Sequence, residues 1–291
     1  EGKLAHGRIY VGVHAPGLAA MTRALAQWAG EANDRDVVVV APLANHSGAS
    51  AAVGTVYERE AIAYRVVRIE GAEEVHAYGI DAPPAMAAIV GALGAFGPKP
   101  DIIVSGINLG VNVGRSVLHS GTVGAALTGA QHGITGLAVS LRSIVDPPPW
   151  ETAATTAVAL LPALANAPTR TVLSLNVPAV PLYELRGIRR GRIGTGGMIK
   201  TAVSTEPVLT DGRFGREPGG TRQGEIRLQL GTAIPSLGDT QDEDPQDDAA
   251  LVAAGYASLT AIVGTGEDTR HDVSNIVDQA IGDAARRLGT T

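Results

Sequence analysis

The chain has 291 residues, of which 45% are hydrophobic and 18% are charged, and its formal net charge is −6. This composition is that of a folded α/β protein and excludes a disordered chain. The negative charge argues against a nucleic-acid polymer as the main partner, and the absence of cysteine excludes disulfides, a thiolate nucleophile and a thiolate metal site.

The sequence gives no sign of a membrane partner. No run of apolar residues reaches the length that spans a bilayer, and the first residues lack the apolar core of a signal peptide. We therefore expect a cytoplasmic protein.

Residues 1–180 alternate between short β-branched runs and alanine-rich helical segments. This alternation predicts a doubly wound, mostly parallel sheet with right-handed crossovers. Two of the predicted strands, at 64–69 and 75–80, are expected to form a hairpin-like excursion. The other predicted strands are Arg8–Val11, Val37–Val40, Asp101–Val104, Gly136–Leu141 and Thr171–Asn176, and the predicted helices are Pro16–Gly30, Ala85–Phe96, Val123–Ala130 and Trp150–Ala165.

The composition changes from residue 181, and we treat residues 181–291 as a second unit. A basic cluster comes first, followed by a segment rich in Gly, Thr and Pro and by a predicted strand at 225–230. We expect an antiparallel β excursion over the site or over a partner subunit, with a surface loop as the alternative. The basic residues are Arg186, Arg189, Arg190 and Arg192, and the later predicted elements are a helical turn at 249–254, a strand at 256–263 and an amphipathic helix at 272–288.

The segment from residue 100 to 130 carries most of the polar chemistry of the chain. Ser105 to Asn108 follow the buried strand Asp101–Val104, and ligands of open α/β sheets bind beyond the carboxyl ends of the strands. Asn108 is therefore directed at a candidate site. Farther on, Ser120 or Thr122 is placed to cap an alanine-rich helix, whose free N–H groups and dipole attract anions.

The glycines of this segment fit neither a Walker loop nor the usual dinucleotide fingerprint. The whole string SGINLGVNVG, followed by SGTVGAA, instead resembles the central motif of the SurE family of metal-dependent phosphatases, the 5′/3′-nucleotidases. HAPGL at 14–18, VVAPLANHSGAS at 39–50 and LNVP at 175–178 resemble further segments of that family. The resemblance implies a Rossmann-like sheet with a β-rich C-terminal extension that is used in assembling a homodimer or homotetramer.

The resemblance also implies the site residues. One divalent cation, Mg²⁺ or Mn²⁺, would be held by Ser47, by Asn108 and by an Asp-Asp pair after the first strand. Asn112 would join Asn108 as a catalytic residue. The phosphate-binding residues would be Gly48, Ser120, Gly121 and Thr122.

Four histidines could act as acids or bases, and each also has a structural alternative. His119 is the best functional candidate, because it immediately precedes Ser120 and could donate a proton to the leaving oxygen. The others are His14, His46 and His132.

The resemblance fails where the carboxylates should be. The family has Ser/Thr-Asn-Asp-Asp-Gly after the first strand, whereas here Val11 is followed directly by Gly12 and the HAPG segment. Mg²⁺ and Mn²⁺ normally require one or two carboxylates, so the chain as printed should bind a cation poorly. Either the metal site has been lost, or the printed sequence lacks four residues of the natural protein. We favour the second explanation, because both flanks are intact.

The expected activity is hydrolysis of nucleoside 5′/3′-monophosphates by a metal-dependent nucleotidase or acid phosphatase. A specialised phosphorylated metabolite is an alternative substrate, and a non-catalytic phosphate-binding protein is an alternative function. A Ser-His-Asp hydrolase is disfavoured, because Ser47, Ser105 and Ser120 all lack the G-x-S-x-G pattern of a nucleophile elbow.

Overall fold

The computed structural model describes residues 8–10, 15–31, 35–55, 60–142, 144–195, 199–203, 228–232 and 244–264. Within these ranges, nine strands form one sheet in the order β3-β4-β2-β1-β5-β6-β7-β11-β8, and β9 and β10 form a second. The strands are β1 (Arg8–Tyr10), β2 (Asp36–Pro42), β3 (Tyr64–Val67), β4 (His76–Ile80), β5 (Ile102–Leu109), β6 (Thr135–Leu141), β7 (Val172–Val177), β8 (Ile188–Arg190), β9 (Ile199–Val203), β10 (Leu228–Thr232) and β11 (Ala257–Ile262).

The centre of the large sheet is parallel, as the alternating sequence predicts. β4, β2, β1, β5, β6 and β7 pair with one another in parallel. Antiparallel pairing occurs toward the edges, where β3 pairs with β4 and β11 pairs with β7. The predicted doubly wound fold and the hairpin-like excursion at β3 and β4 are thus confirmed.

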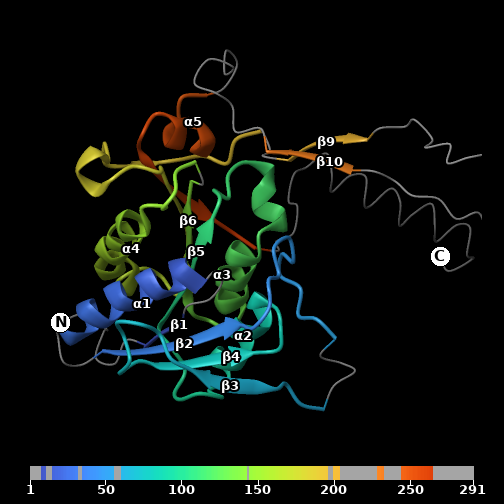
Figure 1. Ribbon diagram of the computed structural model, residues 1–291, viewed down its shortest axis with the longest axis vertical. Coiled ribbons are helices and arrows are strands. Elements are labelled where there is room, and N and C mark those ends of the chain that lie inside the picture. Colours follow the sequence, from blue (N-terminus) through green and yellow to red (C-terminus); the bar gives the residue numbers. More distant parts are fainter. Residues whose placement is uncertain are drawn as a thin grey trace, which may run out of the picture.

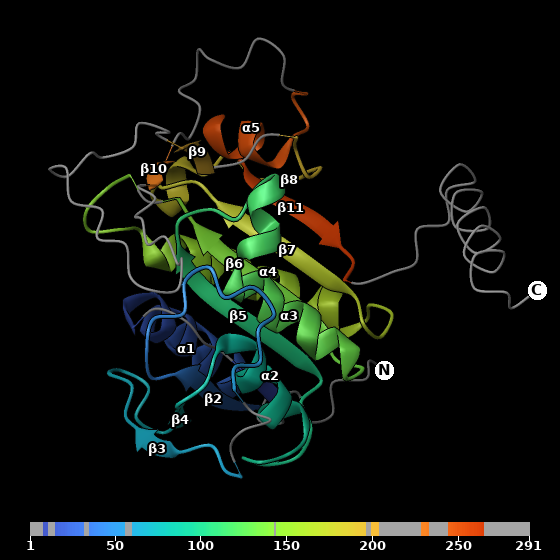
Figure 2. The ribbon, with the colours of Figure 1, turned by 90° about the vertical axis from the view of Figure 1, so that its right-hand side faces the viewer.

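Helices cover both faces of this sheet (Figures 1 and 2). α1 (Ala15–Gly30) and α4 (Trp150–Ala165) pack on one face, and α2 (Pro84–Ala92) and α3 (Gly121–Gln131) pack on the other. The side chains of β5 alternate accordingly, since Ile102 and Val104 belong to the core cluster under α1 and α4, whereas Ile103 belongs to the cluster under α2 and α3. A strand buried on both faces explains why its sequence is continuously apolar.

β5 is longer than predicted. It continues past Val104 to Leu109, and its register against β6 shifts between Ser105 and Asn108. Gly106 permits this irregularity, because its φ is +139° and a Cβ there would collide with the carbonyl oxygen of Val139. A bulge of this kind redirects side chains near a site, and it leaves Asn108 at the carboxyl edge of the sheet.

The segment after residue 180 returns to the main sheet. β8 pairs in parallel with β11, and β9 pairs with β10 in a separate antiparallel sheet, which agrees with the predicted β-rich extension. α5 (Asp248–Ala253) lies between the excursion and β11. The predicted helix at 272–288 lies outside the described residues, and the described helices include none long and apolar enough to cross a membrane.

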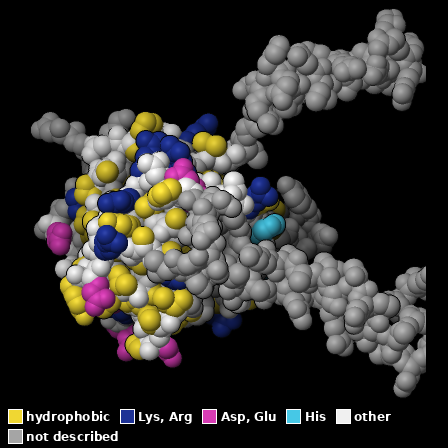
Figure 3. All heavy atoms as spheres, turned by 90° about the horizontal axis from the view of Figure 1, so that it is seen from above, with side chains coloured by type: hydrophobic (Ala, Val, Ile, Leu, Met, Phe, Trp, Pro, Cys, Tyr) yellow, Lys and Arg dark blue, Asp and Glu magenta, His cyan; other side chains and the backbone are white. Residues whose placement is uncertain are grey.

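The α5 end of the molecule carries basic and hydrophobic side chains side by side (Figure 3). The predicted basic cluster after residue 181 is engaged within the chain. The guanidinium groups of Arg186 and Arg189 lie 4.5 and 3.9 Å from the ring centre of Tyr256, and Arg192 pairs with Asp244 at 3.2 Å. Three of these four arginines therefore contact Tyr256 or Asp244, which helps to hold β8 and its flanking residues in place.

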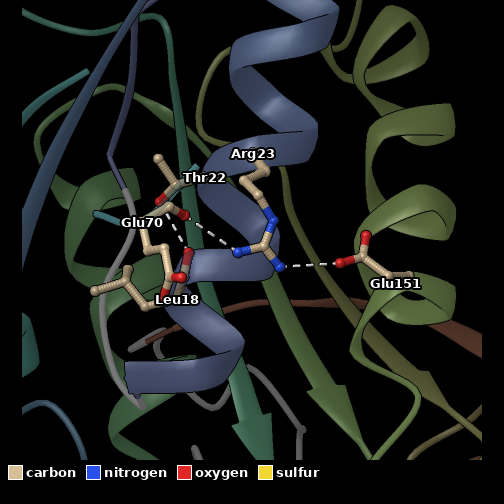
Figure 4. A network of polar contacts seen from close by, with 5 residues as sticks. All are labelled: Leu18, Thr22, Arg23, Glu70 and Glu151. Atoms are coloured by element: carbon tan, nitrogen blue, oxygen red, sulfur yellow. Dashed lines mark hydrogen bonds and ion pairs between the residues drawn. The ribbon is translucent and has the colours of Figure 1, made fainter. Parts of the chain in front are cut away.

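An exposed polar network joins α1 to α4 (Figure 4). Arg23 donates to the Glu151 carboxylate at 3.0 Å and to the carbonyl oxygen of Glu70 at 3.3 Å. The side chains of Arg23 and Glu151 are 39% and 70% exposed. Water screens such a pair, so the apolar contacts beneath it should hold α4 in place.

Two substitutions on α4 test this ranking. Leu161→Ala is expected to lower the free energy of unfolding by about 2–5 kcal/mol, because it opens a cavity in a well-packed core where Leu161 is 0% exposed. Glu151→Ala should lower it by less than about 1 kcal/mol. Chemical denaturation followed by circular dichroism measures both, and equal losses would show that the ion pair matters as much as the packing.

Candidate functional site

A cavity of about 220 Å³, called the site cavity below, opens at the carboxyl end of β5. Four segments form its walls: the loop after β2, the first residue of α2, the end of β5 with the chain that follows it, and the start of α3 with the preceding 3₁₀ helix η2 (Arg115–His119). All eight site residues named from the sequence line it. The lining residues are His46, Ser47, Gly48, Pro84, Asn108, Leu109, Gly110, Val111, Asn112, Ser116, His119, Ser120, Gly121 and Thr122.

The start of α3 gives the cavity its anion-binding character. Ser120 is the N-cap, and its Oγ accepts a hydrogen bond from the Val123 N–H at 3.1 Å. The Gly124 N–H bonds to the Ser120 carbonyl oxygen at 2.9 Å, which leaves the N–H groups of Gly121 and Thr122 without an intrahelical partner. The first turn contains no acidic residue, so the positive end of the helix dipole faces the cavity unopposed.

The loop after β2 is fixed both internally and against η2. The Ser47 N–H and Oγ both donate to the Asn45 side-chain oxygen, at 2.9 and 2.7 Å. Ser50 bonds to η2 through its N–H, which donates to the His119 carbonyl oxygen at 3.2 Å, and through its Oγ, which donates to the Leu118 carbonyl oxygen at 2.7 Å. These bonds hold Ser47 and Gly48 opposite the start of α3.

The two asparagines at and after the end of β5 have different environments. Asn108 donates from Nδ2 to the Gly110 carbonyl oxygen at 2.6 Å, and its Oδ1 accepts no hydrogen bond from the described residues. Asn112 is 8% exposed and donates from Nδ2 to the Ser140 Oγ at 2.7 Å. Its backbone N–H and carbonyl oxygen bond to the side chain of Asn176, at 2.7 and 3.1 Å. Asn112 is therefore held rigidly from below.

Sequence reasoning missed Ser140 and Asn176 as supports of the site, although a signal was present. Both residues lie near the carboxyl ends of strands, Ser140 on β6 beside β5 and Asn176 on β7, the next strand along. The same rule that selects Asn108 applies to them, because the carboxyl ends of parallel strands meet at one edge of a sheet.

The residues present do not fit a divalent cation. Ser47 and Asn108 offer neutral oxygens, and none of the residues lining the cavity is acidic. The described part of the chain contains no group of three or more His, Asp or Glu side chains placed to hold a metal ion, and Val11–His14 contains no carboxylate. A hard cation that loses hydration water normally needs carboxylate ligands, so the predicted cation depends on residues that this chain does not contain.

The fold and the cavity define an α/β protein with a candidate anion site at the carboxyl edge of its sheet. Residues 11–199 match the family model described as Survival protein SurE. The chain is 34% identical over 265 residues to the 5′/3′-nucleotidase SurE of Salmonella paratyphi B, an alignment that covers 90% of this chain and 91% of the relative. The corresponding protein of Salmonella typhi gives the same values.

The structural comparison agrees with the sequence comparison. The crystal structure of the SurE protein from Aquifex aeolicus superposes with a TM-score of 0.65 and 24% identity, covering 88% of this chain and 93% of that one. That likeness shows the shared fold. The match over residues 11–199 and the 34% identity to the Salmonella proteins show that the chain belongs to the SurE family.

Gly124 offers a test of the cavity walls. A methyl group at this position would collide with the carbonyl group of Ser50 and would lie 2.7 Å from the Ala51 nitrogen. Gly124→Ala should push the loop after β2 away from α3, lowering the affinity for inorganic phosphate about tenfold and the stability by about 1–3 kcal/mol. Calorimetric titration and thermal denaturation measure the two effects.

The matched control is Gly30→Ala, at the end of α1, because a Cβ there would meet nothing within 4 Å. This variant should keep the phosphate affinity and the stability of the wild type. Unchanged phosphate affinity in Gly124→Ala would mean that the contact between the loop and α3 does not shape the site.

Proposed function

We propose that this chain is a phosphomonoesterase that hydrolyses nucleoside monophosphates. The observation that carries the proposal is the site cavity, in which all eight residues named from the sequence surround an unopposed helix N-terminus. The relatives from Salmonella, aligned over 90% of the chain, bear the name 5′/3′-nucleotidase. Their name supports a nucleoside monophosphate over other phosphomonoesters.

The start of α3 would bind the phosphoryl group. The N–H groups of Gly121 and Thr122 would donate to its oxygens, and the Thr122 hydroxyl, which has no hydrogen bond in the described part of the chain, could donate as well. Asn112 and Gly48 would complete the enclosure from the opposite walls. Donors fixed before the reaction stabilise charge without having to reorient.

His119 would act on the leaving group. It lines the cavity immediately before the N-cap Ser120. When water attacks phosphorus, the bond between phosphorus and the ribose oxygen breaks, and that oxygen must gain a proton to leave as an alcohol. The imidazolium of His119 would supply this proton, and the proton released by the attacking water would return to solvent.

The predicted Mg²⁺ or Mn²⁺ remains a proposal that depends on the missing Asp-Asp pair. The roles proposed for α3 and His119 do not depend on a cation, and Ser47 and Asn108 alone do not make a site for one. The absence of carboxylates favours a second candidate function, which is a protein that binds phosphomonoesters without turning them over. A specialised phosphorylated metabolite remains the alternative substrate.

Assembly and location also remain predictions. The expected homodimer or homotetramer was inferred from the family and from the β-rich segment after residue 180. Sedimentation of the purified protein would determine the assembly, and cell fractionation would test the expected cytoplasmic location.

Insertion of the absent loop tests the function. We expect the chain as printed to hydrolyse nucleoside monophosphates slowly and equally well with EDTA or with added Mg²⁺ or Mn²⁺. Inserting Thr-Asn-Asp-Asp between Val11 and Gly12 should raise the rate about 100-fold or more in the presence of the cation, because carboxylates allow a cation to stabilise the transition state. Released phosphate is measured across a panel of phosphomonoesters.

Insertion of Thr-Asn-Asn-Asn is the control, since it restores the length of the loop without its charge. Phosphate binding without hydrolysis in every variant would favour the second candidate function. An EDTA-sensitive rate in the chain as printed would contradict the conclusion that its donors do not fit a cation.

The role of His119 is tested through the leaving group. His119→Asn should lower the rate on a nucleoside monophosphate by about 10²–10⁴-fold, because the ribose alkoxide leaves poorly without a proton. The rate on p-nitrophenyl phosphate should change little, since nitrophenolate leaves unprotonated. Steady-state kinetics with both substrates measures the contrast, and an equal loss on both would exclude the general-acid role. His132→Asn, at the other end of α3, is the control.

A further inference from the structure

Asp248 is a buried carboxylate that the proposed reaction does not use. It is 1% exposed and begins α5, the short helix that follows the β excursion. No residue of α5 lines the site cavity. Burial raises the pKa of the Asp248 carboxyl, whereas hydrogen bonds from Gly114, Gly194 and Ala249 act in the opposite direction. Because burying a carboxylate is unfavourable unless hydrogen bonds compensate for the lost water, its position needs a structural explanation.

The partners of Asp248 come from three parts of the chain. Its two oxygens accept from the Gly114 N–H at 3.1 and 3.0 Å. Oδ1 also accepts from the Gly194 N–H at 3.2 Å and from the Ala249 N–H at 2.9 Å. One side chain thus joins the residue before η2, the residue near the start of the β excursion, and the helix that ends the excursion.

Gly114 closes a loop that forms one wall of the cavity. This wall loop, residues 110–114, is fastened through alternate N–H groups. The Gly110 N–H bonds to the Leu141 carbonyl oxygen at 2.7 Å, the Asn112 N–H to the Asn176 side chain at 2.7 Å, and the Gly114 N–H to Asp248. The first two anchors belong to β6 and β7. Asp248 is the anchor supplied from beyond the excursion.

Apolar packing supports the same contact. Val111 and Val113 of the wall loop form a small buried cluster with Val252, and Ala249 packs against it. α5 therefore contacts the wall loop in two ways. Its first residue, Asp248, accepts a hydrogen bond from the loop, and Val252, one turn later, packs against the valines of the loop. η2, which carries the cavity residues Ser116 and His119, begins directly after Gly114.

We propose that Asp248 is a positioning residue for the site cavity: by holding the Gly114 N–H, it sets the wall loop and η2 at the distance from α3 that a phosphoryl group requires. The inference rests on the proposed phosphate-binding function. Asp248 does not contact the substrate, and it acts only through the backbone of Gly114.

The chemistry of the carboxylate makes the residue type specific. Three N–H donors converge on its two oxygens, and a carboxylate only accepts hydrogen bonds. An asparagine with its oxygen at the Oδ1 position would place its NH₂ group where Oδ2 now accepts from the Gly114 N–H at 3.0 Å. Two donors would then face each other at this contact, which is unfavourable enough to move the wall loop.

The test is Asp248→Asn in the full chain, with inorganic phosphate as the probe in calorimetric titration. We expect the Kd for phosphate to rise about tenfold. In hydrolysis of a nucleoside monophosphate, the KM should rise more than the kcat falls. A merely structural role would lower the melting temperature and the folded fraction, but it would leave the phosphate Kd of the folded molecules unchanged.

Asp247→Asn is the matched control, because Asp247 precedes α5 and carries the same charge but accepts no hydrogen bond from the wall loop. It should keep the wild-type Kd. If Asp248→Asn does not fold, Val252→Ala is the substitute, because it weakens the packing between α5 and the wall loop. It should also raise the Kd. Wild-type affinity in whichever of these two variants folds overturns the inference, whereas a wild-type protein that binds no phosphate overturns the proposed function and, with it, this inference.

Discussion

The site is organised around an electrostatic constraint, namely a helix N-terminus buried at the carboxyl edge of a parallel sheet. An α-helix begins with N–H groups that have no intrahelical partner, and burial makes each of them unfavourable if it stays unpaired. In α3, the Ser120 side chain accepts from one of these donors, the Val123 N–H. The N–H groups of Gly121 and Thr122 remain without an intrahelical partner. Without an acid in the first turn, an oxyanion is the natural acceptor. The other walls of the cavity hold the loop after β2 and the wall loop at a fixed distance from this end of α3, so that the helix start stays accessible.

Spacing is achieved through backbone contact and through buried polar side chains. Gly124 lets the loop after β2 lie directly on α3, where any side chain would collide with Ser50. On the other wall, Asn112 is held by Ser140 and Asn176, which are 1% exposed and gain hydrogen bonds in return. Such networks specify one arrangement, because breaking any member leaves a buried polar group unsatisfied. The rigidity of the cavity therefore follows from its polar interior as much as from its apolar core.

The sequence predicts the framework of the fold well, because local patterns encode it. Continuous apolar runs indicate strands covered on both faces, and β2, β6 and β7 lie close to their predicted positions. The motifs that resemble the SurE family, after β2 and from β5 to α3, predict which side chains gather at the site, and the structure places all eight on one cavity. The extension of β5 to Leu109 was missed, since a bulge at Gly106 depends on contact with β6, which no local pattern records.

The contact of Asp248 with Gly114 illustrates what sequence reasoning cannot reach. The two residues are 134 positions apart, and the acidic run that ends at Asp248 predicts an exposed segment, although Asp248 also fits the late TD…GY pattern of the SurE family. Only tertiary folding carries α5 back onto the wall loop. The resemblance places the family's Asp-Asp pair in a different segment, after the first strand, whereas the site cavity is lined by the loop after β2, the end of β5 and the start of α3. The contacts that order these lining segments are all made by described residues that do not belong to the Asp-Asp segment. The order of the cavity therefore does not depend on the Asp-Asp pair.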